Sequence, residues 1–290
     1  MSRLPPWIRQ PLRTDRHYGS VQQVLAQLSL HTVCHSAHCP NQQECWNRGT
    51  ATFMILGNTC TRACQFCNVT TGQPAAPDAG EPARLAEAVQ KMKLRHVVIT
   101  SVTRDDLPDG GAAHFAATIA AVRAAQPGAL IEVLTPDFGG ATDALNVVLA
   151  ARPDVFNHNL ETVRRLQREI RPQADYERSL GVLRHAAHFL PKPAVKSGLM
   201  VGLGETDDEL LAALRDLRAA GCELLTVGQY LRPKNSKREV ARFVTPEAFA
   251  QLEQAARALG FSAVAAGPLV RSSYRAEELT QSAAAEANAT

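Results

Sequence analysis

Short runs of β-forming residues alternate with longer helical runs from residue 52 to residue 266. This order predicts parallel βαβ units, because parallel strands need a long crossover that is usually a helix. Periodicity alone allows either an open doubly wound sheet or a barrel. In both, ligands bind at the carboxyl ends of the strands. We expect strands at 52–56, 96–101, 130–134, 155–159, 195–201, 224–228 and 262–266, and helices at 20–28, 81–94, 112–125, 141–150, 161–170, 175–188 and 246–259, with one more after the capping box of Thr206 and Glu209.

Six of the seven cysteines fall between residues 34 and 67. Cys60, Cys64 and Cys67 follow the first expected strand with the spacing CxxxCxxC. Three such thiolates can bind three irons of a four-iron cluster and leave one iron open for chemistry. The same spacing also lies on one helix face, as for buried apolar residues, or could serve zinc. Zinc commonly uses CxxC pairs, and only one pair is present, so the spacing favours the cluster.

A second triad lies upstream, where Cys34, Cys39 and Cys45 have the spacing CxxxxCxxxxxC. Three histidines, His31, His35 and His38, are interleaved with them. Mixed Cys and His clusters suit zinc, and the triad alone leaves zinc and iron–sulfur open. Cys222 stands apart, and we expect it to be a small buried residue before a strand rather than a ligand.

Other features narrow the class of protein. Residues 1–6 lack the apolar region of a signal peptide, and no apolar run is long enough to span a bilayer. The thiols therefore point to metal or catalysis rather than to disulfides. The net charge of +3 is too small to imply a nucleic acid or a membrane surface. Residues 281–290 are Ala-rich and polar, and we expect a disordered tail there.

The two triads together resemble those of the lipoyl synthases, a family of radical S-adenosylmethionine (SAM) enzymes. CxxxCxxC alone identifies only the superfamily, and the combination with the first triad and an Arg-Ser-Ser-Tyr segment is far more specific. The similar stretches cover almost the whole chain: residues 4–9, 100–107, 109–112, 156–162, 196–205 and 271–274.

The resemblance implies an α/β fold, a radical SAM partial (β/α)6 barrel over residues 52–266. Residues 1–51 would be an extension carrying an auxiliary iron–sulfur cluster, and residues 267–290 a C-terminal segment with a serine ligand and a tail. The implied activity inserts sulfur at C6 and C8 of a protein-bound octanoyl-lysine. No general acid or base can ionise such C–H bonds, so a radical cofactor is required.

The resemblance also assigns cofactors, namely SAM and two 4Fe-4S clusters. Cys60, Cys64 and Cys67 would hold the cluster that binds and cleaves SAM. Cys34, Cys39 and Cys45 would hold the sulfur-donating cluster, with Ser273 as fourth ligand and Ser272 as the next candidate. Serine is a poor iron ligand because its alkoxide is hard, which is useful if the cluster must be dismantled.

Seven further residues are expected to contact SAM, and each has a plainer interpretation. Phe66 would lie against adenine or pack in its loop, and Thr100 and Ser101 would contact the methionine part or cap a turn. Asn159 and Glu161 flank the end of the fourth strand and could bind SAM through hydrogen bonds, while Glu161 could instead be an ordinary acid at a helix N-terminus. Arg171 and Lys196 could pair with the SAM carboxylate or lie on the surface.

The implied partners are octanoylated lipoyl carrier domains, an electron donor such as flavodoxin or ferredoxin, and an iron–sulfur carrier protein. We expect no nucleic acid, no membrane and a cytoplasmic location. One alternative is a radical SAM methylthiotransferase acting on tRNA, although no added RNA-binding domain or basic stretch is visible. Another is a non-catalytic zinc or iron–sulfur scaffold, which would form no 5′-deoxyadenosine.

Overall fold

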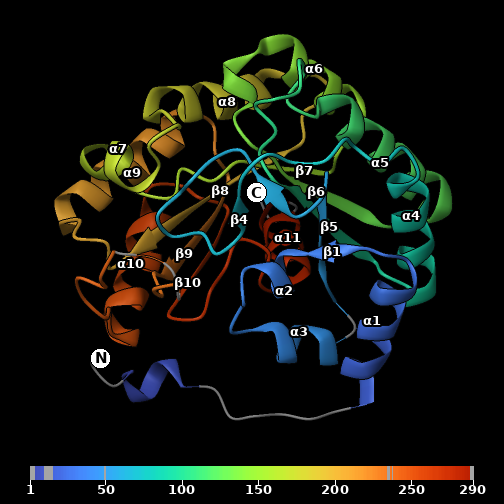
Figure 1. Cartoon of the computed structure of the whole chain (residues 1–290). Helices are drawn as coiled ribbons and strands as arrows, with labels where there is room; N and C mark the ends of the chain where they lie inside the picture. Colours follow the sequence, from blue (N-terminus) through green and yellow to red (C-terminus); the bar gives the residue numbers. More distant parts are fainter. Residues whose placement is uncertain (1–3, 10–15, 49, 234–235, 237, 288–290) are drawn as a thin grey trace.

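The computed structural model describes residues 4–9, 16–48, 50–233, 236 and 238–287. Strands occupy the centre of the molecule and helices surround them (Figure 1). The main sheet has eight strands in the order β1-β2-β5-β6-β7-β8-β9-β10. These strands are β1 His31–Thr32, β2 Thr52–Ile55, β5 His96–Ser101, β6 Leu130–Leu134, β7 Val155–Asn157, β8 Ala194–Val201, β9 Leu224–Gln229 and β10 Ala263–Gly267.

All neighbouring pairs from β2 to β10 are parallel, and β1 alone joins the sheet antiparallel to β2. Six strand–helix units followed by β10 curve into the expected partial barrel. The sheet ends at β1 on one side and at β10 on the other, so its edges do not pair with each other. The carboxyl ends of six successive parallel strands thus gather on one side, where the expected site residues lie.

Helices cover the outside of the sheet (Figure 1). Those between barrel strands are α4 Glu81–Met92, α5 Ala112–Ala125, α6 Thr142–Ala150, α7 Gln167–Ile170, α8 Tyr176–His188, α9 Asp207–Ala219 and α10 Pro246–Ala258, with short 3-10 turns at Phe138–Gly140 and Arg164–Leu166. The capping box of Thr206 and Glu209 is present at the start of α9, as predicted. In the part of the chain that the structure describes, no helix is both long and apolar enough to cross a bilayer.

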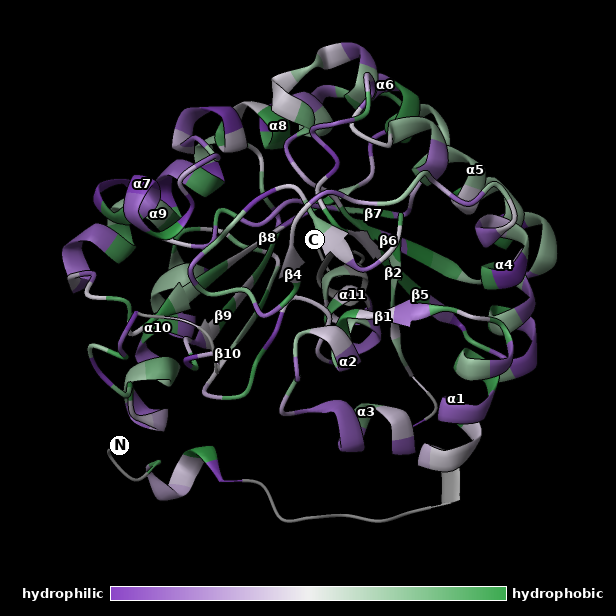
Figure 2. Cartoon of the chain, viewed as in Figure 1, coloured by the Kyte–Doolittle hydropathy of each residue, from purple (hydrophilic) through white to green (hydrophobic). Residues whose placement is uncertain are grey.

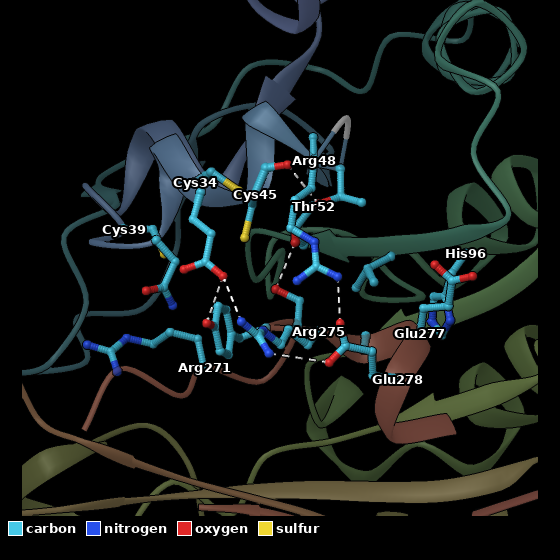
Figure 3. Close-up of a pocket in the computed structure, with 18 residues that line it drawn as sticks. Cys34, Cys39, Cys45, Arg48, Thr52, His96, Arg271, Arg275, Glu277 and Glu278 are labelled. Atoms are coloured by element: carbon cyan, nitrogen blue, oxygen red, sulfur yellow. Dashed lines mark hydrogen bonds and ion pairs between the residues drawn. The ribbon is translucent and has the colours of Figure 1, made fainter. Parts of the chain in front are cut away.

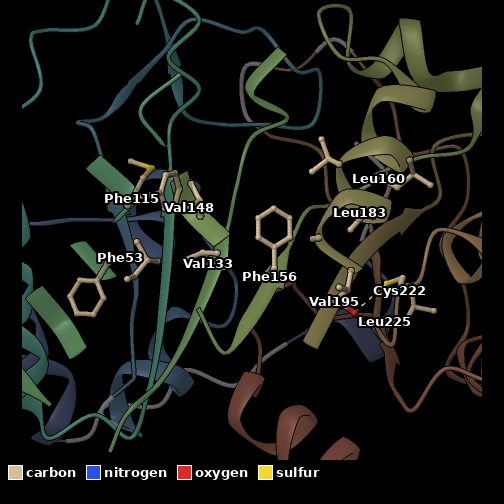
Figure 4. Packing of buried hydrophobic residues seen from close by; sticks show 14 of the residues in the cluster. Phe53, Phe115, Val133, Val148, Phe156, Leu160, Leu183, Val195, Cys222 and Leu225 are labelled. Carbon is tan, nitrogen blue, oxygen red and sulfur yellow. Dashed lines mark hydrogen bonds between the residues drawn. The ribbon is translucent and has the colours of Figure 1, made fainter. Parts of the chain in front are cut away.

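Side chains alternate between two environments along the strands. Those facing outward are apolar and pack under the helices, as Phe53, Val133 and Phe156 do (Figure 4). Hydrophobic residues are correspondingly concentrated on the central strands, while α3, α7 and α9 are largely hydrophilic (Figure 2). The strands are short runs buried along most of their length, as is typical of parallel strands covered on both faces. The inward positions include charged residues, so part of the barrel interior is polar.

The helix expected over residues 161–170 is shorter than predicted. A 3-10 turn begins only at Arg164, and α7 follows over Gln167–Ile170. Glu161 has a left-handed backbone with φ 70°, which a right-handed helix cannot contain. Its N–H donates to the carbonyl of Gly198 at 2.9 Å, and its carbonyl accepts from Met200 at 2.9 Å. Pairing with β8 therefore replaces the first helical turn.

The expectation of a disordered tail from residue 281 is also wrong for the described residues. Helix α11 spans Ala276–Ala287 and lies within the ring of strands in Figure 1. Leu279 is buried in a cluster with Val155, Leu224 and Ala263, the first or second residues of three barrel strands. The helix therefore closes the amino-terminal end of the barrel. Residues 288–290 lie outside the described part.

The N-terminal extension packs against the barrel on the side of β2. It contains a 3-10 turn at Pro6–Ile8, α1 Arg16–Gln27, α2 Val33–Ser36 and α3 Gln42–Asn47. The helix predicted at 20–28 is thus α1, which begins earlier and buries Val21 and Leu25. The rings of Tyr18 and Trp46 lie 5.0 Å apart and join α1 to α3. These contacts fix the helices that carry the first cysteine triad.

Candidate functional site

The CxxxCxxC loop leaves the carboxyl end of β2 and is fastened by a small parallel ladder, β3 Thr59–Cys60 with β4 Thr70–Thr71. The Cys60 sulfur accepts from the backbone N–H groups of Arg62 at 3.4 Å and Thr103 at 3.3 Å. The Cys67 sulfur accepts from the N–H of Val69 at 3.5 Å. Such bonds stabilise thiolates and tune the potential of a cluster bound to them.

Arg62 anchors this loop from inside, a role that the sequence did not reveal. Its guanidinium binds both carboxylate oxygens of Asp105, at 2.8 and 2.7 Å, and one oxygen of Asp137 at 2.7 Å. Asp137 is fully buried, and burial alone would raise its pKa, but the contacts with Arg62 lower it to about 2. Asp137 follows the carboxyl end of β6, and this position was the sequence signal that could have predicted a role at the site. Bidentate Arg–carboxylate pairs hold geometry tightly.

A second polar group lies beyond β7. Asn159 donates through its amide to Glu161 Oε1 at 3.0 Å, and Arg171 donates to the carbonyls of Asn159 and Leu160 at 3.1 and 3.2 Å. Burial raises the pKa of Glu161, although Arg171 and Asn159 favour the carboxylate. Arg171 also opposes the burial-driven rise in the pKa of Cys64. Three of the expected SAM contacts thus lie together beside the CxxxCxxC loop.

The backbone around this group needs a glycine at one point. A Cβ at Gly198 would lie 2.8 Å from both Asn159 Oδ1 and Thr226 Oγ1, so a side chain there would displace them. Asn159 Oδ1 and Arg171 Nε are buried without a hydrogen-bond partner among the described residues. Buried polar atoms rarely stay unpaired, so these two are candidates for contact with a ligand.

Three other residues expected to contact SAM, Ser101, Thr100 and Phe66, differ in how their side chains are bonded and packed. Ser101, at the end of β5, also has a buried hydroxyl without a described partner. The Thr100 hydroxyl donates to the carbonyl of Leu134 at 2.9 Å and so already serves the sheet. Phe66 is half-buried against the apolar core.

Lys196 requires a correction. Its ammonium lies inside the barrel at 2.8 Å from Glu132 Oε1, and both side chains are fully buried. Asn157 donates to the same oxygen at 3.0 Å, and His96 lies 3.3 Å from the other oxygen of Glu132. Burial would raise the pKa of Glu132, but chiefly the charge of Lys196 lowers it to about 2. We therefore leave Lys196 out of the SAM site and assign it to the barrel interior.

Lys196→Met should destabilise the protein by about 3–5 kcal/mol, because it leaves the Glu132 carboxylate buried without its counter-ion. Urea unfolding at neutral pH measures this. The matched control is Lys192→Met, which removes a half-exposed pair with Glu223 and should cost about 0–1 kcal/mol. Since the pKa of Glu132 lies below its ordinary 4.5, the wild type should lose this contribution as the pH falls from 4.5 towards 2. Equal costs for the two variants would contradict this assignment.

The first triad lines a pocket between the extension and the C-terminal segment (Figure 3). Cys34 comes from α2, Cys45 from α3 and Cys39 from the turn between them. Thr52, His96 and Val98 form the barrel side of the pocket, and residues from Arg271 to Glu278 form another wall. Segments more than 200 residues apart in the sequence therefore meet around these thiols.

The pocket suits thiolates only if a cation is present. Burial raises the pKa of Cys34 and Cys39, and burial together with the two neighbouring thiols raises the pKa of Cys45 to about 12. Thiols crowded in this way stay protonated unless a bound metal offsets their repulsion. The positive charge of Arg271 opposes the rise in the pKa of Cys39.

Both triads fit iron–sulfur clusters better than single metal ions. The thiols in each triad are close enough to raise one another's pKa. Within the described residues, however, no three His, Cys, Asp or Glu side chains converge on one ion position. A zinc ion needs sulfurs at about 2.3 Å from one centre, whereas cluster thiolates bind separate irons and lie further apart. All seven cysteines are free, and Cys222 is fully buried in the core, as predicted.

The two serines of the C-terminal segment face different partners. The Ser273 hydroxyl accepts from Thr52 Oγ1 at 2.7 Å and lines the pocket of the first triad. The Ser272 hydroxyl accepts from Asn159 at 2.6 Å and thus contacts the group beside the CxxxCxxC loop. One turn of chain therefore connects the two cysteine sites.

Comparisons with known proteins agree with this geometry. The Radical SAM superfamily pattern matches residues 54–217. The lipoyl synthase of Rubrobacter xylanophilus is 55% identical over 279 residues, which cover 96% of this chain and 87% of that protein. The lipoyl synthase of Thermus thermophilus is 56% identical over 277 residues, covering 95% and 86%. The crystal structure of HydG, a maturase of the FeFe-hydrogenase, matches with a TM-score of 0.58 at 14% identity, over 85% of this chain and 66% of that one, and supports the fold alone.

Proposed function

The chain belongs to the lipoyl synthase family of radical SAM enzymes, and we propose that it inserts two sulfur atoms, at C6 and C8, into an octanoyl chain linked to a lysine of a carrier protein. The observation that carries the proposal is the meeting of two cysteine triads at residues 271–274. Ser272 contacts Asn159 at one site, and Ser273 lines the pocket of the other.

We infer that Cys60, Cys64 and Cys67 hold the cluster that binds SAM, and that Cys34, Cys39, Cys45 and Ser273 hold the auxiliary cluster. When bound, the first cluster supplies the electron that cleaves SAM, and the second supplies sulfur. The residues of the two triads and Ser273 would hold these groups at fixed positions.

We assign the SAM contacts from the unpaired atoms of the site. Arg171 has a buried Nε free of a described partner and is our candidate for the SAM carboxylate. Glu161 can accept from the amino or hydroxyl groups, and Asn159 offers a free carbonyl oxygen. Ser101 and Thr100 complete this side, and Phe66 offers an aromatic face for adenine. The Glu161 backbone, strained at φ 70° and held by β8, is typical of a residue fixed for function.

The proposed organisation has three parts: an extension at 1–51, a barrel at 52–266 and a C-terminal segment at 267–290 whose helix α11 replaces the expected tail. Octanoylated lipoyl carrier domains are the proposed substrates. An electron donor such as flavodoxin or ferredoxin and an iron–sulfur carrier are proposed because the reaction consumes electrons and sulfur. We place the protein in the cytoplasm, since seven free thiols suit a reducing compartment.

The serine assignment is tested by two variants. Ser273→Cys should still assemble two clusters and still form 5′-deoxyadenosine, but it should fail to insert sulfur, because a thiolate holds the fourth iron more strongly than an alkoxide. Ser272→Ala should be milder, since it removes only the bond to Asn159. Anaerobic assays that follow deoxyadenosine and lipoyl product separately distinguish these outcomes.

If Ser272→Ala blocks sulfur insertion while Ser273→Cys stays fully active, the two serines exchange roles. If neither variant changes the product, the fourth ligand lies elsewhere, and His35 or His38 becomes the next candidate. A scaffold protein, by contrast, forms no deoxyadenosine from SAM and dithionite even as wild type.

A further inference from the structure

Glu44 connects the two segments that form the auxiliary pocket. It precedes Cys45 on α3, and its Oε1 accepts from the Tyr274 hydroxyl at 2.9 Å and from Arg275 Nη2 at 3.1 Å. Tyr274 and Arg275 directly follow Ser273 in the sequence. A single carboxylate next to one cysteine therefore holds the two residues next to the serine.

The turn that carries Ser273 needs such support. Residues 272–275 form turns rather than a strand or helix, and Arg275 has a left-handed backbone with φ 50°. Non-glycine residues keep this conformation only where their surroundings hold them. Glu44 supplies that restraint, and Arg275 also lies 3.5 Å from Glu278 at the start of α11. Without these contacts the residues after Ser273 would be held less firmly, with the bond from Thr52 to Ser273 remaining.

Within the turn, Ser273 also accepts from Thr52 at 2.7 Å and Ser272 from Asn159 at 2.6 Å, and further contacts flank the turn on both sides. Arg48 binds Glu278 at 2.5 Å, and Arg95 binds Glu277 at 2.9 Å. Both tie α11 to the body of the protein, downstream of the serine. Asn41 donates to the carbonyl of Leu269 at 2.6 Å, upstream of it. Among the described contacts, those of Glu44 join the cysteine-bearing helix to the two residues that directly follow Ser273.

We propose that Glu44 is a positioning residue for the auxiliary cluster: through Tyr274 and Arg275 it holds the Ser273 hydroxyl beside the three thiols. This inference rests on the proposed function, because it takes Ser273 as the fourth ligand. The Glu44 side chain is 24% exposed, and a charged hydrogen bond at such a site is weaker than a buried one. Glu44 therefore holds the serine in place to complete the cluster. Its contacts with Tyr274 and Arg275 remain accessible to water.

The test measures the fourth iron of the auxiliary cluster in reconstituted protein that carries Cys64→Ala throughout, because the SAM-binding cluster also has an iron without a thiolate and would give the same signal. A four-iron cluster that loses the iron lacking a thiolate becomes a three-iron cluster, whose oxidised form has its own EPR signal. With a chelator under mild oxidation, Glu44→Ala should form this signal about tenfold faster than wild type, the usual effect of removing an outer-shell partner. Glu44→Gln keeps an acceptor oxygen and should stay near the wild-type rate. Arg95→Ala breaks an ion pair to the same helix and is the matched control.

Hydrogen exchange of the metal-free protein gives a second readout. Amides of residues 272–276 should exchange faster in Glu44→Ala than in wild type or Glu44→Gln, with other regions unchanged. Tyr274→Phe removes one of the two bonds and should give a smaller increase in both measurements, which keeps the test usable if Glu44→Ala folds poorly.

The variant Ser273→Ala tests the assignment of Ser273 as an iron ligand separately from the proposed role of Glu44. If Ser273→Ala loses the fourth iron no faster than wild type, the serine ligand itself is wrong. If Ser273→Ala loses it quickly while Glu44→Ala and Tyr274→Phe behave as wild type, only the role of Glu44 is overturned. Equal acceleration in Glu44→Ala and Arg95→Ala would also overturn it, because the effect would then belong to α11 as a whole.

Discussion

Cys64→Ala should abolish formation of 5′-deoxyadenosine, because the SAM-binding cluster has only three protein anchors and each removal exposes a second iron. Cys64 lies in the middle of the CxxxCxxC loop, beside the charge of Arg171. Iron bound at this site should fall as well, while the auxiliary cluster should assemble normally. Anaerobic incubation with SAM and dithionite, followed by quantification of deoxyadenosine, measures the effect.

Cys222→Ala is the matched control, since it removes the same thiol from a fully buried position outside both triads. Its sulfur donates only to backbone carbonyls, at 3.2 Å to Leu224. SAM cleavage should therefore stay at the wild-type level. Near-normal cleavage by Cys64→Ala would rule out the assignment of the CxxxCxxC cysteines.

Cys34→Ala should separate the two reactions. It removes a buried thiol from the first triad, so the iron content after reconstitution should fall from about eight to about four per chain. SAM cleavage should persist, because the CxxxCxxC loop has its own supports in Arg62, Asp105 and Asp137. Sulfur insertion should be lost. Iron analysis and separate assays of deoxyadenosine and lipoyl product report the three quantities.

The reverse pattern, with sulfur insertion retained and SAM cleavage lost, would exchange the roles of the two triads. Loss of all bound iron in Cys34→Ala would instead show that the two clusters do not assemble independently. Cys222→Ala again provides the control, with iron content and both products unchanged.

The strands and helices of the barrel could be predicted from the sequence where local sequence pattern determines them. The expected strands and most helices lie within one or two residues of the observed ones, because β-forming runs, helical runs and caps are local signals. The curvature of the sheet into a partial barrel was not visible in periodicity and came from the family resemblance. The helix over 161–170 was overestimated because pairing of Glu161 with β8 is a long-range contact.

The candidate site shows the same division. The cysteine spacings identified both triads, since ligands near in sequence leave a local pattern. The ion pair of Arg62 with Asp137 joins two loops, and the ion pair of Lys196 with Glu132 joins two strands. Helix α11 was misjudged because its Ala-rich sequence has little apolar pattern, while Leu279 and Ala283 pack against the barrel core and ion pairs of Glu277 and Glu278 hold its first turn. Such contacts depend on tertiary placement.

The most direct test of the central claim is mass spectrometry of an octanoyl-lysine peptide after reaction with the reconstituted protein, SAM and dithionite. Clusters built with heavy sulfur should label the product. We expect wild type to give a peptide that gains two heavy sulfur atoms, at C6 and C8, and Cys34→Ala to leave the peptide unmodified despite continued SAM cleavage. A wild-type protein that cleaves SAM but leaves the octanoyl chain free of labelled sulfur would contradict it.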